Sequence, residues 1–276
     1  MQKTKFALSI VSAAALLTLA ACGGGGGDSA SAAQQPATPT PPAPTITVQG
    51  SATVVSGDPL AVILVPQGSS TTKTVTGTIS SASFAAQFQK ATAEGAYTQF
   101  GVDANSLVTL SSGKVVDVAG NGDFAIGRWT DGGSSVGTIN SNQGSHYAVG
   151  RPIKLLPDLT VGAPDIKVNC SAVASTSPTA VSGNFAPGKL NSAVAVVDLT
   201  FATLDSFNLD VAIGSDAHAT AAVTGSILNG VFIAGGVLQQ VQTFGPSATK
   251  PYLAIGYAIP TPTSGDVTGV VVLKCQ

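Results

Sequence analysis

The sequence predicts an all-β, antiparallel fold, with an eight-stranded up-and-down barrel preceded by a β-rich N-terminal extension. Val and Thr are abundant and recur in short runs, whereas the chain has one methionine and few charged residues, and so few good helix formers. Turn residues separate these runs at intervals of roughly 10 to 15 residues. Because no helix-length crossover lies between the runs, neighbouring strands should be antiparallel. Closing the sheet into a barrel would remove its exposed edges.

The first part of the folded chain predicts short strands and one ambiguous segment. Residues 83–93 have a partly helical pattern, because Phe84, Phe88 and Ala91 fall on one face before Gly95 ends it. A later hairpin is predicted at Asn121-Gly122, since Asn-Gly between two apolar runs is typical of a tight β-turn. The strands expected up to this hairpin and just beyond it are 45–49, 60–65, 71–79, 107–110, 113–118 and 123–129.

The second part of the chain is more regular, and several of its runs alternate between apolar and polar residues, as a strand with one buried face does. We therefore assign residues 113–276 to the barrel and residues 45–112 to the N-terminal extension. The strands expected here are 146–149, 165–170, 194–201, 207–213, 218–223, 230–233, 239–244, 252–259 and 267–274.

The N-terminus has the pattern of an export signal. Lys3 and Lys5 precede an apolar run over residues 6–19, and small residues follow it. Leu19-Ala20-Ala21-Cys22 resembles the bacterial lipobox, in which cleavage precedes a cysteine that carries a diacylglycerol. The resemblance implies that residues 1–21 are a signal peptide and that Cys22 is lipidated. The alternatives are an ordinary signal peptide or an uncleaved membrane helix, for which the run is short of the roughly 20 residues required.

Residues 22–44 predict a disordered tether, because five glycines and a proline-rich stretch cannot bury enough apolar surface to fold. Gly23 follows the cysteine directly. In enterobacterial lipoproteins an Asp at that place favours retention in the inner membrane, so the resemblance implies a lipid anchor in the outer membrane. The expected membrane partner is reached through this N-terminal lipid.

The two remaining cysteines, Cys170 and Cys275, predict a disulfide, since an exported protein folds in an oxidising compartment. The alternative is a pair of buried free thiols. A metal site is not predicted, because neither cysteine belongs to a CxxC pair and no histidine lies nearby in sequence.

Composition excludes some partners. Only 9% of the chain is charged, and the formal net charge is −2. Nucleic-acid binding requires clustered Lys and Arg, so no nucleic-acid partner is expected. The sequence also predicts no cofactor.

Several short motifs in the second part resemble a known family. They are Gly-Arg-Trp at 127–129, His-Tyr-Ala-Val-Gly at 146–150, residues 196–201, Gly-Val-Phe at 230–232 and Ala-Ile-Gly-Tyr at 254–257. Together they resemble the lipoprotein barrels of the transferrin-binding protein B type, and C-terminal domains of some bacterial proteins with FecR regions. The resemblance implies an eight-stranded lipoprotein barrel that binds or displays something. Transferrin binding is not implied, since that protein has two lobes and this chain has room for one barrel.

Three motifs could carry chemistry, and each has a structural alternative. Ser135 stands in a G-x-S-x-G match, for which His146 and His218 are the only candidate bases, but no helix pattern follows as in a nucleophile elbow. Gly120–Ala125 matches a dinucleotide-binding fingerprint, yet a strand follows instead of a helix, which favours a hairpin. A third possibility is Ca²⁺ at the same turn, with oxygen ligands from Asp117, Asn121 and Asp123.

Two further pairs are candidate sites. Asp216 and His218 are two residues apart on an expected strand and should share a face, unless a turn at Gly214 explains them. Arg128 and Trp129 are a possible binding pair, because Arg and Trp often anchor interfaces. The alternative for Trp129 is packing in the barrel core.

Three function classes follow. We expect a non-enzymatic binding or surface-display lipoprotein whose partner is an envelope protein, an extracellular protein or a small ligand. The alternative is a structural or assembly component of the cell envelope, which an exposed apolar patch would favour. A serine hydrolase is the third class, and the chain has few groups for acid–base work. The chain is therefore predicted not to be an enzyme.

Overall fold

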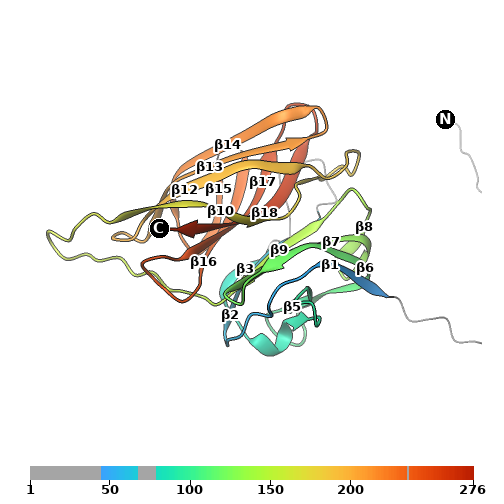
Figure 1. Ribbon diagram of the computed structural model, residues 1–276, viewed down its shortest axis with the longest axis horizontal. Coiled ribbons are helices and arrows are strands. Elements are labelled where there is room, and N and C mark those ends of the chain that lie inside the picture. The colour runs from blue at the N-terminus through green and yellow to red at the C-terminus, as the bar shows by residue number, and fades with distance from the viewer. Residues whose placement is uncertain (1–44, 68–78, 235) are drawn as a thin grey trace, which may run out of the picture. The chain divides into compact units, whose positions relative to one another are not determined.

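The computed structural model describes residues 45–67, 79–234 and 236–276, which belong to one compact unit. This unit is all-β and antiparallel, and its two sheets form barrel-like shapes (Figure 1). The predicted fold class is confirmed. The predictions for the signal peptide, for Cys22 and for the tether at 22–44 lie outside the described residues.

The first sheet contains nine strands and has the order β3-β2-β9-β7-β6-β5-β4, with β1 and β8 attached beside β6 and β7. One pair departs from the antiparallel pattern, because β1 runs parallel to β6. The elements are β1 (Ile46–Gly50), β2 (Leu60–Val65), β3 (Ile79–Phe84), the 3-10 turn η1 (Ala86–Phe88), β4 (Lys90–Ala91), β5 (Tyr97–Gly101), β6 (Leu107–Gly120), β7 (Phe124–Ser134), β8 (Gly137–Ile139) and β9 (Ser145–Gly150).

Strand β2 is apolar at every position because both of its faces are buried. Leu60, Val62 and Leu64 belong to the core of the first sheet, whereas Ile63 and Val65 belong to a second core between the two sheets. A strand that is buried on both faces has no polar face, so it does not alternate.

The predicted hairpin at Asn121-Gly122 is confirmed. It joins β6 to β7, which pair antiparallel, and the Asn121 N–H donates to the Phe124 carbonyl at 3.1 Å. Gly122 has φ +87°, which only glycine adopts without strain.

The helical pattern at 83–93 predicted the wrong structure. Only the single 3-10 turn η1 forms, and β4 then pairs with β5. The Gln89 side chain explains the difference, because its Nε2 donates to the Gly101 carbonyl at 2.8 Å and its Oε1 accepts from the Gly101 N–H at 3.1 Å. These bonds tie the segment to the end of β5, which a local periodicity cannot reveal.

The second sheet is the barrel. Its hydrogen-bonded order is β14-β13-β12-β10-β18-β17-β16-β15, an up-and-down arrangement in which the first strand pairs with the last. Within the described residues no ladder joins β14 to β15, so the barrel is open along that line. The strands are β10 (Lys167–Ser175), β11 (Thr179–Ala180, paired with β18), β12 (Lys189–Asp198), β13 (Thr203–Ile213), β14 (Asp216–Ile227), β15 (Gly230–Ala234), β16 (Val237–Phe244), β17 (Tyr252–Pro260) and β18 (Asp266–Cys275).

Alternation builds the barrel interior. On β14, Ala219, Ala221 and Val223 point into the barrel core, and the residues between them are exposed. The boundary between the two sheets falls between Gly150 and Lys167. Residue 113, where the barrel assignment began, lies inside β6, and the strands at 124–150 hydrogen-bond within the first sheet.

The two sheets pack through an apolar layer in which β17 approaches β2 closely. A Cβ on Gly256 would lie 2.7 Å from the Ile63 Cγ2 atom and 2.8 Å from the Val65 Cγ2 atom. Both distances are too short for a side chain, so glycine at this position permits the contact. The other members of the layer are Ala61, Phe124, Ile126, Ala148, Leu238, Phe244, Ala254, Ala258, Val270 and Val272.

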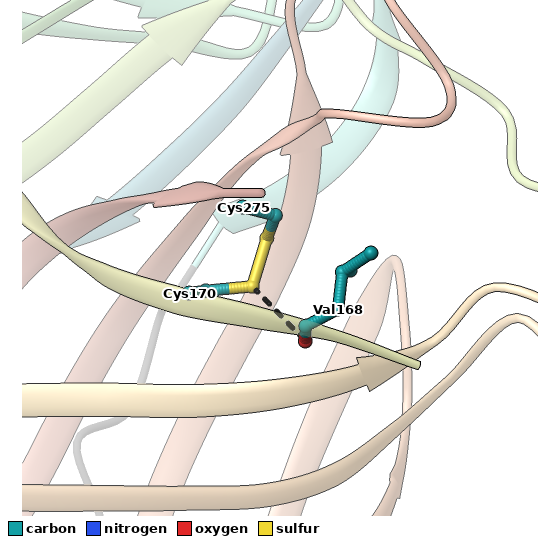
Figure 2. The surroundings of a disulfide bond; sticks show 3 residues. All are labelled: Val168, Cys170 and Cys275. Atoms are coloured by element: carbon teal, nitrogen blue, oxygen red, sulfur yellow. Dashed lines mark hydrogen bonds between the residues drawn. A yellow bond between two sulfur atoms is a disulfide. The ribbon is translucent and has the colours of Figure 1, made fainter. Parts of the chain in front are cut away.

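The predicted disulfide is confirmed. Cys170 on β10 lies directly opposite Cys275 on β18, and a bond joins their sulfur atoms (Figure 2). It therefore links the first long strand of the barrel to the last. Both side chains are buried.

Candidate binding site at the barrel mouth

Residues 151–166 connect the two sheets and lie beside one end of the barrel, which we call the barrel mouth. The β12–β13, β14–β15 and β16–β17 turns form this end. The segment enters along the end of β16, where the Ile153 N–H donates to the Thr243 carbonyl at 3.0 Å and the Gly245 N–H donates to the Arg151 carbonyl at 2.9 Å. Its start is therefore fixed to the barrel by backbone hydrogen bonds.

The segment is fixed again at its far side, on the β12–β13 turn. The Leu199 N–H donates to the Ile166 carbonyl at 2.8 Å, and the Thr200 hydroxyl donates to the Pro164 carbonyl at 2.6 Å. The Asp158 N–H also donates to the Thr200 carbonyl at 2.6 Å. These hydrogen bonds hold both ends of the segment at the mouth.

Leu155 lies between these anchors and packs against the barrel core. A hollow lies on each side of it. The smaller one has a volume of about 340 Å³, and Leu156, Asp158 and Leu199 are among its lining residues. The larger has a volume of about 490 Å³, and Ala82 and Leu228 are among its lining residues. Volumes of this order, at the mouth of a β-barrel, are typical of small-molecule sites.

Electrostatics distinguish the two hollows. Lys154 lines both. The smaller hollow also contains Asp158, and hydrogen bonds from Thr160 lower the pKa of that carboxyl below its ordinary value of 3.8. The smaller hollow therefore holds both signs of charge, whereas Lys154 is the one charged residue among the described residues that line the larger.

Large apolar side chains are exposed around the mouth. Leu156 is 66% exposed, Leu159 is 78% exposed and Val161 is fully exposed. Phe201, on the β12–β13 turn, is 53% exposed. We call these four residues the apolar rim. Exposed large apolar side chains on a connecting segment and on the turn that it contacts are typical of a contact surface.

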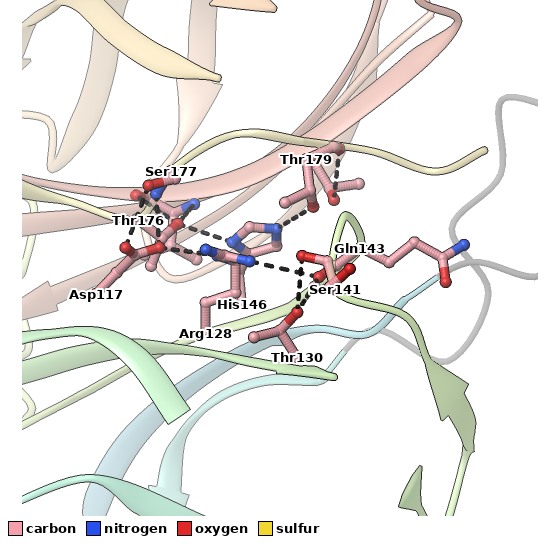
Figure 3. A network of polar contacts seen from close by, with 12 residues as sticks. Asp117, Arg128, Thr130, Ser141, Gln143, His146, Thr176, Ser177 and Thr179 are labelled. Carbon is pink, nitrogen blue, oxygen red and sulfur yellow. Dashed lines mark hydrogen bonds and ion pairs between the residues drawn. The ribbon is translucent and has the colours of Figure 1, made fainter. Parts of the chain in front are cut away.

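A buried polar network fixes the first sheet to the barrel (Figure 3). Asp117 on β6 accepts from the Arg128 Nε atom at 2.8 Å and from the Ser177 N–H at 2.9 Å. The Ser177 hydroxyl donates to its second oxygen at 3.1 Å. Asp117 has φ +56° and lies at an irregularity in the β6–β7 ladder, which turns it away from regular strand geometry. The bulge thus directs a carboxylate at the barrel.

His146 belongs to the same network. Its two ring nitrogens lie 2.8 Å from the Thr176 and Thr179 hydroxyls, which belong to the barrel. Burial, and then the positive charge of Arg128, hold the pKa of His146 well below its ordinary value of 6.5. The ring is therefore neutral and serves as a structural link.

Arg128 and Trp129, the possible binding pair, are both buried on opposite faces of β7. The Trp129 Nε1 atom donates to the Tyr97 carbonyl at 2.7 Å, and its ring stacks on Phe100 with 5.5 Å between centroids. Arg128 forms an ion pair with Asp117. The packing alternative accounts for Trp129, and neither side chain offers a surface to a partner in this conformation.

The residues of the hydrolase hypothesis are bonded elsewhere. The Ser135 hydroxyl accepts from the Thr109 N–H at 3.0 Å, and the Ser135 N–H donates to the Thr109 carbonyl. His146 is occupied as described above. His218 lies 2.8 Å from an oxygen of Asp210 on the neighbouring strand. Ser135, His146 and His218 therefore each bond to different residues, and none of these hydrogen bonds joins the serine to a histidine.

Asp216 and His218 do not share a face, contrary to the expectation. A register irregularity in the β13–β14 ladder separates them, so Asp216 is buried and the His218 side chain is 73% exposed. Burial alone would raise the pKa of Asp216, but hydrogen bonds from Thr263 and Ser264 outweigh it and lower the pKa to about 2. Asp216 therefore fastens the β17–β18 turn to β14.

The oxygen-bearing residues proposed for Ca²⁺ also have separate partners. Asn121 donates through Nδ2 to the Tyr252 hydroxyl at 3.0 Å, and Asp123 pairs with Arg151. Among the described residues, no group of three or more His, Cys, Asp or Glu side chains is arranged to hold a metal ion. Nor does that part of the chain contain a helix long and apolar enough to cross a bilayer.

The barrel core contains polar atoms that sequence inspection did not single out. Gln239 on β16 lies opposite Tyr257 on β17, and both are fully buried. Neither the Gln239 amide nor the Tyr257 hydroxyl has a hydrogen-bond partner within the described ranges. Burial raises the pKa of Tyr257 well above its ordinary value of 10.0, so its hydroxyl stays protonated.

Sequence reasoning also missed Lys154, Leu155 and the hollows beside them. Their only signal was the length of the connecting segment between 150 and 166 and its apolar residues. Loops of that length without secondary structure are often functional. Comparison with protein-family models, with curated proteins and with solved structures found no match to this chain.

Proposed function

We propose that this protein is an outer-membrane lipoprotein, anchored through Cys22, whose barrel mouth binds a ligand without chemical turnover. The observation that carries the binding role is the pair of hollows, lined largely by apolar side chains, on either side of Leu155. The N-terminal lipobox resemblance and the resemblance to transferrin-binding protein B barrels support the anchor and a binding or display role. The Cys170–Cys275 disulfide fits an oxidising compartment.

The separation of Ser135 from the two histidines supports a role without catalysis. Acyl transfer by a serine requires a base within hydrogen-bond reach of the hydroxyl. The hydrogen bonds of Ser135, His146 and His218 lead to other residues.

The anchor is tested by the variant Cys22→Ser, compared with wild type after metabolic labelling with a radioactive fatty acid and membrane fractionation. Wild type should incorporate label and float with outer membranes, and the variant should do neither. Label in Cys22→Ser, or unlabelled wild type, would overturn lipidation. Wild type that fractionates with inner membranes would overturn the outer-membrane assignment.

Binding at the mouth is tested with the neutral probe N-phenyl-1-naphthylamine, which fluoresces in apolar sites. The variant Ala82→Trp places a large side chain in the larger hollow, and Ala222→Trp places the same side chain on the exposed face of β14. Wild type and Ala222→Trp should bind the probe with equal affinity, and Ala82→Trp should lose at least about 10-fold, equivalent to roughly 1.4 kcal/mol. Equal binding by all three, or binding by none, would contradict a site in the mouth.

The apolar rim supports a second candidate function, a structural role in envelope assembly. Leu159 is 78% exposed and Val161 is fully exposed, so these apolar side chains are available to a partner. The double variant Leu159→Ser, Val161→Ser should then lose crosslinks to another envelope component in whole cells while keeping its melting temperature. A crosslinking pattern unchanged by these substitutions would argue against this second role.

A further inference from the structure

The charge at the larger hollow is positive and comes from Lys154. Lys154 is exposed at its edge, and within the described part of the chain its ammonium group has no ion pair or hydrogen bond. Of the described residues that line this hollow, none is acidic. The nearest acid in sequence, Asp158, lines the smaller hollow on the other side of Leu155. The Lys154 ammonium group would therefore attract a negatively charged ligand group, and no carboxylate among the described lining residues would repel it.

Asn229 supplies a second donor on the same hollow. It lies in the β14–β15 turn, and its Oδ1 atom accepts from the Thr243 N–H at 2.9 Å. Thr243 is fully buried, so this bond fixes the orientation of the amide. With the oxygen engaged, the Nδ2 group is the free end of the Asn229 side chain, and it can only donate.

The other described residues that line the hollow are apolar, and two of them border the barrel core. Leu155 and Leu228 line the hollow and also pack against the barrel core. Ala82, Pro152 and Ile153 also line the apolar side. An apolar wall with two donors at its edge is complementary to a chain that ends in an anionic head group.

We propose that the larger hollow binds a free single-chain carboxylate of the fatty-acid class. The alkyl chain lies against Leu155 and Leu228, and the carboxylate accepts from Lys154 and Asn229. This assignment rests on the proposed binding function and specifies the ligand of the same site. No bond is made or broken.

The test uses isothermal titration calorimetry on the mature chain with Cys22→Ser, so that no attached lipid competes. The probes are dodecanoate, dodecanol and dodecylamine, each below its micelle concentration. Dodecanoate should bind most tightly, and dodecylamine should bind at least about 10-fold more weakly. Lys154→Gln should weaken dodecanoate binding about 3- to 10-fold and leave dodecanol unchanged. Lys189→Gln, an exposed lysine on β12, is the matched control and should change neither.

The outcomes separate this proposal from the function it rests on. If dodecanol binds as tightly as dodecanoate and Lys154→Gln has no effect, the carboxylate assignment is overturned while a binding site remains. If no alkyl probe binds but N-phenyl-1-naphthylamine does, the fatty-acid class is overturned and the binding function stands. If nothing binds, both are overturned.

Discussion

His146 on β9 is hydrogen-bonded to Thr179 on β11, with 2.8 Å between Nε2 and Oγ1, and this contact joins the first sheet to the barrel. Thr176 holds the other ring nitrogen. The charged groups at the ring are Arg128 and, through it, Asp117. The structure therefore buries a titratable residue where the two sheets meet.

The protein should lose stability as the pH falls below about 6.5. The pKa of His146 is lowered in the folded chain, so the unfolded chain binds a proton that the folded chain does not. The free energy of unfolding then decreases with falling pH, with a slope that approaches one proton per molecule. Urea unfolding between about pH 7.5 and about pH 5.5 measures it. In His146→Gln this slope should disappear, and in the control His218→Gln, on the exposed face, it should remain. A wild-type slope in His146→Gln would disprove the assignment.

Removing the disulfide should destabilise the barrel. The bond closes a loop with a sequence separation of 105, and it joins β10 to β18, the pair that connects the two halves of the sheet. The double variant Cys170→Ala, Cys275→Ala should lower the free energy of unfolding by about 2 to 4 kcal/mol. Guanidinium unfolding of the variant, and of wild type with and without a reductant, provides the comparison. A reductant that leaves the wild-type midpoint unchanged while the thiols become alkylatable would contradict the prediction.

Trp129 should act as a core residue. Trp129→Ala should cost about 3 to 5 kcal/mol, because it opens a cavity beside Phe100 and leaves the Tyr97 carbonyl unpaired. Trp129→Phe keeps most of the volume and should cost less. Since Trp129 is the one tryptophan of the chain, its emission should also be blue-shifted and poorly quenched by acrylamide. Strong quenching in the native protein would be inconsistent with its burial.

Gln239→Leu should stabilise the barrel. The Gln239 amide is buried and has no hydrogen-bond partner among the residues that the structure describes. Replacing such a group by an apolar one of similar size removes a desolvation cost of about 1 to 3 kcal/mol. Gln242→Leu is the comparison, because Gln242 donates to the Ser80 hydroxyl at 2.9 Å and would lose that bond. Gln239→Leu should therefore raise the melting temperature more than Gln242→Leu does. A lower melting temperature for Gln239→Leu would show that its amide is satisfied.

Features that depend on local pattern could be predicted from the sequence. Alternation over residues 207–213 indicated one buried face on β13, and the Asn121-Gly122 pair located the β6–β7 hairpin. Cys170 and Cys275 could be paired because the N-terminal pattern predicts export to an oxidising compartment and the predicted lipobox assigns Cys22 to a lipid.

Features that depend on contacts between distant segments could not. Asp117 meets Arg128 and Ser177 only because a bulge turns it toward the barrel. The boundary near Gly150 was missed because both sheets use the same strand-forming residues, and composition does not change there. Lys154 looked like any surface lysine until the connecting segment was placed on the barrel mouth.

The position of β1 has a mechanical consequence. The chain enters the folded unit through this strand, which runs parallel to β6 over residues 46–50. A pull directed along β1 from the N-terminal side loads several ladder hydrogen bonds together instead of breaking them one at a time. That force reaches the barrel through the first sheet and then through the apolar layer and polar network that join this sheet to the barrel. The unit should therefore resist tension from that side better than an end strand peeled from an antiparallel edge.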